Sequence, residues 1–140
     1  MRPDVYNNIF QYAKQYIKQK SIYSPEVFKN APTESDIFPL VIIPECKIIL
    51  DEETLKYGER RYEIIFEIEF YATDKSIETN KKVSRETIIH ELEKLVYEVF
   101  EEHYGLMGQR PETRPNADTN IARETISFTG KIKNNIIYRR

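Results

Sequence analysis

The residues whose types and spacing could do chemistry are few. Glu45 and Lys47, with Asp36 upstream, imitate the metal site of a nuclease, in which carboxylates hold Mg²⁺ and a lysine polarises phosphate. Charged residues also alternate along an edge strand simply because the intervening side chains are buried. Pro44 and Cys46 are poor neighbours for a metal site. A small metal-dependent nuclease is therefore one hypothesis, and it is not the preferred one.

The histidines do not complete a catalytic motif. His90-Glu91 begins like the helix of a zinc protease, but the residue four positions after His90 is Lys94, so the second imidazole is missing. His103 is better explained as a helix-end residue that is favoured by the C-terminal dipole. The four glycines are far apart, and none precedes a helix with a lysine, so no phosphate-binding loop is expected. The sequence predicts no catalytic, metal-binding or cofactor-binding residue.

Length and charge limit the class of protein. At 140 residues we expect a single domain, residues 1–140. The 21 basic and 23 acidic residues leave a net charge of -2, which disfavours a protein that coats DNA. From residue 110 to 140, seven basic residues oppose three acidic ones, a balance of +4 that leaves -6 for the rest. This separation fits stacking between unlike faces in an assembly, or a solvated surface with random charge texture.

The cysteine content and the lack of long apolar stretches indicate where the protein is expected to assemble. Cys46 is the only cysteine, which excludes an intrachain disulfide and a four-cysteine zinc site within one chain, so assembly inside a cell is expected. No apolar stretch reaches the roughly 18 residues of a membrane span, and the first residues do not form a signal peptide. Ten tyrosines and no tryptophan fit either interface residues or ordinary half-buried ones.

The first third of the chain predicts one helix and two strands. A helix is expected over residues 4–20, because apolar residues recur at the spacing of one helical face. Residues 21–36 are dense in turn formers and are predicted to be a connecting loop. Strands are expected over 38–43 and 46–50, with an edge position or a bulge at Pro44, which cannot donate a ladder hydrogen bond.

The clearest strand pattern follows a charged link over residues 51–59. Residues 62–71 alternate between one apolar and one largely acidic face. The apolar set is Tyr62, Ile64, Phe66, Ile68 and Phe70, and the acidic set is Glu63, Glu67 and Glu69. Ile65 and Tyr71 interrupt the acidic face, and a neighbouring subunit could cover them.

A second helix is predicted after residues 73–82, which are polar and without periodicity. Ser84 is the expected N-cap, and Gly105 supplies the left-handed stop. Residues 106–120 contain too many glycines and prolines for a helix, although part of this segment can lie extended. The helix is expected to pack on the sheet through Ile88, Leu92, Leu95, Val96, Val99 and Phe100.

The chain is predicted to end in a hairpin. A strand over 121–133 has an apolar face and a wet face, and Asn134-Asn135 turns the chain into a last strand over 136–138. The wet face is expected to carry Arg123, Thr125, Ser127, Thr129 and Lys131. The expected fold is α+β, a largely antiparallel sheet with two main helices packed on one face.

Several short sequence motifs within this predicted order of elements carry a family resemblance. They are Phe70-Tyr71-Ala72-Thr73-Asp74-Lys75 at the end of a strand, then Pro115-Asn116-Ala117-Asp118, Ile121-Ala122-Arg123, Gly130 and Ile136-Ile137-Tyr138-Arg139-Arg140. With the order of elements, they resemble the tail terminator or tail completion proteins of long-tailed phages of Gram-positive bacteria. The resemblance covers residues 38–140 and contains no catalytic signature.

The resemblance implies a structural role and no enzymatic activity. Such subunits form a hexameric ring at the head-proximal end of the tail tube, stop its polymerisation and join the tail to the head connector. The implied partners are other copies of the chain, the tail tube protein and the connector protein, and the implied location is the virion, after assembly in the host cytoplasm. A neighbouring connector or head-closure protein is a close alternative.

The candidate interface residues follow from the resemblance and from the charge pattern. They lie in the link and strand before residue 70, in the loop over 106–120 and in the C-terminal strands: Tyr57, Glu59, Arg61, Glu63, Glu67, Glu69, Arg110, Arg114, Arg123, Arg139 and Arg140. An acidic lining would let DNA pass through the ring without binding, because like charges repel. If Arg123 pairs with an acidic neighbour, its reversal to glutamate is expected to weaken assembly and to spare the fold.

Overall fold

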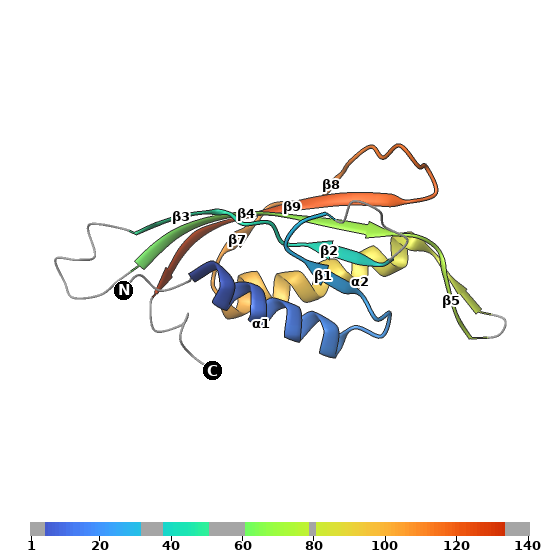
Figure 1. Cartoon of the computed structure of the whole chain (residues 1–140), viewed down its shortest axis with the longest axis horizontal. Coiled ribbons are helices and arrows are strands. Elements are labelled where there is room, and N and C mark those ends of the chain that lie inside the picture. Colours follow the sequence, from blue (N-terminus) through green and yellow to red (C-terminus); the bar gives the residue numbers. More distant parts are fainter. Residues whose placement is uncertain (1–4, 32–37, 51–60, 79–80, 134–140) are drawn as a thin grey trace.

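The structure is a computed structural model that describes residues 5–31, 38–50, 61–78 and 81–133. It confirms the α+β class: one long mixed sheet carries two helices on a single face (Figure 1). The predicted link over 51–59 and the predicted last strand over 136–138 lie outside the described residues. None of the described helices combines the length and the apolar character that crossing a membrane requires.

Two long strands form the centre of the sheet. Strand β4 (Arg61–Ala72) pairs with β9 (Ala122–Lys133) in antiparallel register over all twelve residues of each. On the other side of β4, β2 (Leu40–Ile42) and β3 (Lys47–Leu50) pair one after the other, both antiparallel. The ladder breaks between them as expected at Pro44. There, four residues, 43–46, face three, 66–68, because Ile42 pairs with Glu69 and Lys47 with Ile65.

Short strands complete the two edges of the sheet. Strands β7 (Met107–Gly108) and β8 (Glu112–Thr113) pair with β9, which confirms that the segment after the second helix is partly extended. At the opposite edge, β1 (Glu26–Phe28) runs parallel to β2. The prediction that residues 21–36 form only a connecting loop was therefore wrong. Val27 is fully buried in the core, which fixes this three-residue strand although it is too short to show periodicity.

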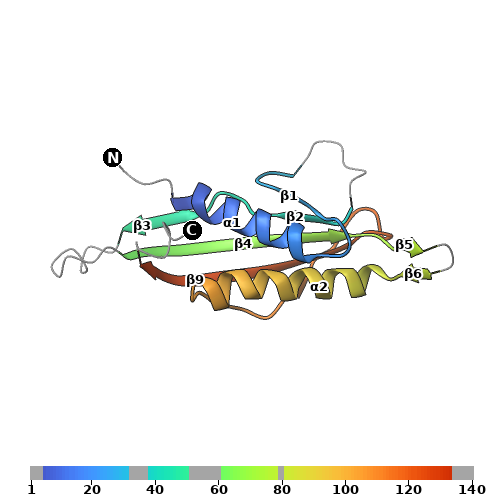
Figure 2. The same ribbon diagram turned by 90° about the horizontal axis from the view of Figure 1, so that it is seen from below.

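Residues 73–82, whose sequence is polar and without periodicity, contain strand structure that the sequence did not indicate. Strands β5 (Lys75–Glu78) and β6 (Lys81–Val83) form a separate two-stranded hairpin that extends from one end of the molecule (Figures 1 and 2). The Lys75 ammonium donates to the carbonyl oxygen of Tyr23 at 2.7 Å, which ties the base of the hairpin to the segment after the first helix. Backbone pairing between neighbours in sequence needs no apolar alternation, so the pattern gave no indication of it.

The helices begin and end close to the predicted residues. Helix α1 (Val5–Lys20) is followed much later by α2 (Arg85–Tyr97), which continues into a six-residue π-helix, η2 (Glu98–His103). The Ser84 hydroxyl caps α2 by accepting the Thr87 N–H at 3.3 Å. Gly105, at φ 74°, ends the helical segment as expected.

The core lies between the helix layer and the apolar face of β4 and β9. Phe66 of β4 meets Phe100 of η2 at 5.0 Å between ring centroids, and Phe100 stacks on Phe128 of β9 at 5.2 Å. All three side chains are fully buried. The Tyr6 hydroxyl of α1 donates to the carbonyl oxygen of Ile43, so the first helix is attached to the same sheet.

The two helices lie side by side under the sheet (Figure 2). The Tyr16 hydroxyl of α1 donates to the Glu98 carboxylate at 2.8 Å, and the Tyr12 ring stacks on His103 at 4.1 Å. The hydrogen bond raises the pKa of Tyr16 to about 12 because the carboxylate disfavours the phenolate. His103 thus lies at the helix end as predicted, and its ring contacts the neighbouring helix.

Gly108 is a test of the packing between β7 and the helix. A Cβ atom there would lie 2.6 Å from ring carbons of Phe128 and Tyr97. We expect Gly108→Ala to lower the free energy of unfolding by about 1–3 kcal/mol, because neither ring can withdraw without disturbing the core. Urea denaturation measures the change. Gln109→Ala, at an exposed neighbouring position, should change stability by less than about 0.5 kcal/mol. Equal stabilities for the two variants would contradict this account of the packing.

Candidate interaction surface on the open face of the sheet

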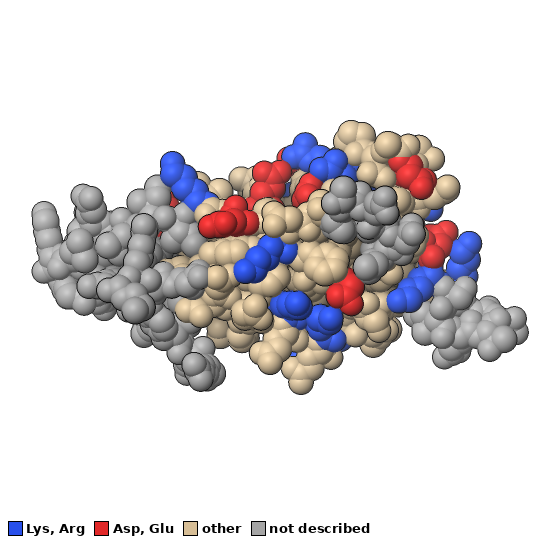
Figure 3. All heavy atoms as spheres, viewed as in Figure 1, with Lys and Arg blue, Asp and Glu red and all other residues tan. Residues whose placement is uncertain are grey.

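The face of the sheet opposite the helices, which we name the open face, is the candidate site. Because paired residues on neighbouring strands point to the same side, the β4–β9 register fixes its members. They are Glu63, Ile65, Glu67, Glu69, Tyr71, Arg123, Thr125, Ser127, Thr129 and Lys131. Neither described helix covers it (Figure 1), and acidic and basic side chains gather over the sheet along the upper side of Figure 3.

An apolar row crosses the middle of the open face. Lys47, Ile65, Thr129 and Met107 are in register across β3, β4, β9 and β7. Ile65 is 45% exposed and Met107 is 75% exposed, and the Thr129 between them is also exposed. Ile65 and Met107 lie on either side of Thr129, and this grouping makes the row a candidate for contact with another molecule. Ile65, which was expected to interrupt the acidic face, is therefore exposed. Its apolar neighbour Met107 was not indicated by the sequence.

Acidic side chains border this row. Glu63 and Glu67 lie two positions before and after Ile65 on β4, so they project to the same side, and both are exposed. Glu67 is directly opposite Ser127, a neutral residue. Glu63 is opposite Lys131, and Lys47 is in the same row as Ile65. The centre of the open face thus combines two exposed apolar side chains with charged neighbours of both signs, and it shows no concentration of positive charge that would indicate a polyanion-binding surface.

Arg123 and Glu69 serve the chain's own fold. The Arg123 guanidinium contacts the Glu69 carboxylate at 2.5 Å and lies 5.6 Å from the centre of the Tyr71 ring. It also donates to the carbonyl oxygen of Pro115 at 3.4 Å. Burial, followed by the Glu69 charge, raises the pKa of Tyr71. Arg123 does pair with an acidic residue, and that residue belongs to the same chain.

Arg114 extends this cluster and corrects one prediction. Its Nε atom donates to the Thr125 hydroxyl at 3.0 Å, and its guanidinium lies 3.0 Å from the Glu112 carboxylate. Thr125 is only 4% exposed, although it was expected on the wet face. It faces the predicted side of β9, but the β8 segment and the Arg114 side chain cover it.

The arginines around a hollow beside this cluster are paired with carboxylates. The hollow measures about 550 Å³ and lies between the start of α2 and the segment around β8 and β9. The three arginines among its lining residues each have a carboxylate partner: Arg85 meets Asp74 at 3.7 Å, Arg114 meets Glu112 and Arg123 meets Glu69. The Arg85 N–H also donates to Asp74, which is the main reason why the pKa of that carboxyl is lowered. The positive charge is thus already compensated.

The remaining predicted residues are dispersed. Arg110 is exposed between β7 and β8, and Arg61 contributes backbone to β4. Tyr57, Glu59, Arg139 and Arg140 lie outside the described residues. Of the whole candidate set, the structure brings Glu63, Glu67, Glu69, Arg114 and Arg123 to one surface.

The nuclease hypothesis rests on residues that the structure only partly describes. Glu45 and Lys47 are exposed, at the link between β2 and β3 and at the start of β3, whereas Asp36 lies outside the described residues. Across the described ranges, no three histidine, cysteine, aspartate or glutamate side chains are grouped in a way that could hold a metal ion.

Comparison with known proteins adds no assignment. No protein-family model and no curated protein matches this sequence.

Glu93 of α2 is a buried carboxyl group that the sequence reading missed. Its residue is 7% exposed, and its Oε2 atom accepts no hydrogen bond from any described residue. Burial, with a smaller contribution from the Glu124 charge, raises its pKa from 4.5 to about 7. Other glutamates precede and follow Glu93 in the helix, so the local sequence pattern does not identify Glu93 as the buried one. Only its position against β9 distinguishes it.

The Arg123–Glu69 pair is expected to stabilise the isolated subunit. We predict that Arg123→Glu lowers the free energy of unfolding by about 1–2 kcal/mol, because two carboxylates then face each other in a half-buried site. The swap of Glu69→Arg with Arg123→Glu should recover part of the loss. Chemical denaturation of the monomeric fraction measures both variants. An unchanged stability of Arg123→Glu would mean that the pair contributes only to contacts between subunits.

Glu93 should make stability depend on pH. Its folded pKa lies above its unfolded value, so the folded state binds the proton more tightly. The stabilisation that the Glu93 carboxyl group contributes is fully present below about pH 4.5 and is lost as the pH rises through about 7. We expect Glu93→Gln to be more stable than the parent at pH 8 by about 1–3 kcal/mol, and equal to it near pH 4. Thermal or urea unfolding across this pH range tests the prediction. If Glu93→Gln is more stable than the parent by an amount that does not vary with pH, the burial argument is wrong.

Proposed function

We propose that this chain is a structural subunit that works by assembly, as a tail terminator or tail completion protein of a long-tailed phage. In this role, copies form a ring at the head-proximal end of the tail tube, stop its growth and join it to the head connector. The observation that carries the proposal is the exposed row of Ile65, Thr129 and Met107 across a charged sheet face. The family resemblance of the sequence supplies the particular assembly.

The apolar row is suited to contact with another protein. When a partner covers exposed isoleucine and methionine side chains, the complex is stabilised by roughly 25 cal/mol per Å² of apolar surface removed from water. The charged residues around the row would form the rim of such a contact, where water remains and where charge sets the choice of partner. A surface built in this way favours binding over turnover.

The acidic margins are compatible with DNA passing nearby. Glu67 is exposed opposite the neutral Ser127, and Glu63 is exposed opposite Lys131, so these margins carry no excess of positive charge. A surface without such an excess neutralises few phosphates and so would not retain DNA in a channel. The proposal therefore assigns contacts with proteins, and not with nucleic acid, to the open face.

The apolar row provides the test. We expect the double variant Ile65→Glu, Met107→Glu to keep its circular dichroism spectrum and to lose at least about tenfold in affinity for tail-tube ends, as judged by sedimentation with purified tubes and by electron microscopy. Ile22→Glu is the matched control, because Ile22 is 72% exposed, lies just beyond the end of α1 and does not belong to the open face. It should bind like the parent.

Two results would overturn the proposed function. One is a parent protein that stays monomeric at high concentration and also fails to bind tube ends. The other is Mg²⁺-dependent cleavage of DNA that Glu45→Ala abolishes, which would instead establish the nuclease hypothesis.

A further inference from the structure

The outward faces of the two helices carry opposite charge. Helix α1 contains no acidic residue, and its outward face forms a shallow hollow of about 770 Å³. The segment of α2 and η2 contains six glutamates against Arg85 and Lys94, and its outward face forms a second hollow of about 410 Å³. The residues that line the first hollow are Gln11, Lys14, Gln15, Lys18 and Gln19.

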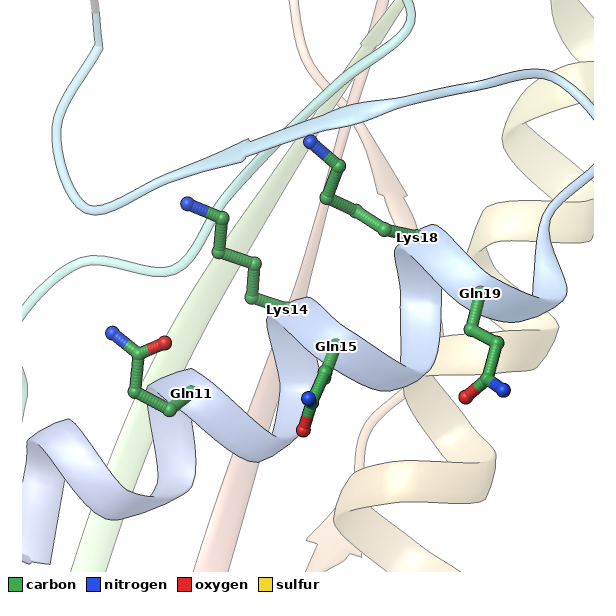
Figure 4. A pocket seen from close by; sticks show the side chains of 5 residues that line it. All are labelled: Gln11, Lys14, Gln15, Lys18 and Gln19. Carbon is green, nitrogen blue, oxygen red and sulfur yellow. The ribbon is translucent and has the colours of Figure 1, made fainter.

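The basic hollow faces away from α2. Figure 4 shows Lys14 and Lys18 pointing to the same side of α1, toward β1, whereas Gln15 and Gln19 point the other way. Lys18 lies 3.4 Å from Glu26 of β1, an exposed pair that contributes little. The side of α1 that faces α2 is occupied by tyrosines, as the Tyr16–Glu98 hydrogen bond shows. The two lysines are therefore available at the β1 edge of the molecule.

The acidic hollow lies on the other side of the helix layer. It is lined by His90, Glu93, Lys94, Tyr97, Glu98, Glu101 and Glu102. Glu101 accepts the Gly108 N–H at 2.8 Å, and the Tyr97 hydroxyl donates to Gln109, so this face borders the β7 edge of the sheet. The helix layer thus has a basic margin toward β1 and an acidic margin toward β7.

We propose that Lys14 and Lys18 of one copy bind the acidic hollow of α2 and η2 on a second copy. This inference rests on the proposed function in assembly and names the contact between copies. The two lysines are one turn of α1 apart, about 6 Å along its axis. Among the glutamates that line the acidic hollow, Glu102 is the exposed one, whereas Glu98 accepts the Tyr16 hydroxyl.

A head-to-tail contact between copies fits these surfaces better than a two-fold contact does. A contact that joins α1 to α1, or α2 to α2, would place like charges opposite each other, which is unfavourable. Because the basic and acidic margins lie on opposite sides of the helix layer, a head-to-tail contact pairs the unlike faces. The resulting pair keeps one free face of each sign, and such contacts close into a ring when the rotation between copies permits it.

A charge exchange between two variants tests the contact. We expect Lys14→Glu, Lys18→Glu and, separately, Glu102→Lys to weaken self-association by at least about tenfold in sedimentation velocity at low salt. Glu102 is exposed, so its reversal should spare the subunit. An equal mixture of the two variants should restore association, because each head-to-tail contact between the two different variants joins unlike charges. Salt of about 0.5 M should weaken association of the parent protein.

A matched control separates this contact from net charge. Lys20→Glu, Lys82→Glu makes the same charge change at exposed lysines outside both hollows, and it should associate like the parent. The inference is overturned if the parent is monomeric at low salt, if the control loses association equally, or if the mixture fails to restore it. Tube-end binding by the parent is measured separately, so the proposed function can survive the loss of this contact.

Discussion

The antiparallel pairing of β4 with β9 is the interaction on which the rest of the structure depends. Twelve residues of each strand are in continuous register, and this register assigns every side chain of the two strands to one of two environments. A slip of one residue would turn Phe66 and Phe128 toward solvent and bring Glu67 into the core. The free energy of burying the aromatic side chains therefore fixes the pairing, and the pairing fixes the composition of the open face.

The helix layer follows from the same constraint. Since Phe100 packs between Phe66 and Phe128, the end of the second helix must lie across both central strands. The π-helical stretch at this end brings Val99 and Phe100 to the core and leaves Glu98 facing Tyr16 of α1. The opposite charges of the two outward faces thus occur on helices whose positions the core has already set.

The open face divides its polar side chains between two tasks. At one end, Arg123, Glu69 and Arg114 are used in contacts within the chain, and they fasten the segment around β8 to the sheet. In the middle, Ile65 and Met107 are exposed between acidic neighbours. The proposed contact of the open face with the tail tube uses the middle, because covering this part of the face buries apolar side chains without breaking the Arg123–Glu69 pair.

The sequence by itself determined the elements that have a repeating environment. The alternation over residues 62–71 and the helical spacing over 5–20 each report a face that stays buried for several turns or pairs, and a local pattern can record that. The tertiary structure decided what depends on contact between distant segments. Val27 becomes a strand residue because β2 lies beside it, and Met107 joins Ile65 because β7 and β4 both reach the same level of the sheet. Arg123 meets Glu69, 54 positions away, for the same reason: such encounters are set by the pairing of strands, which no single segment of the sequence encodes.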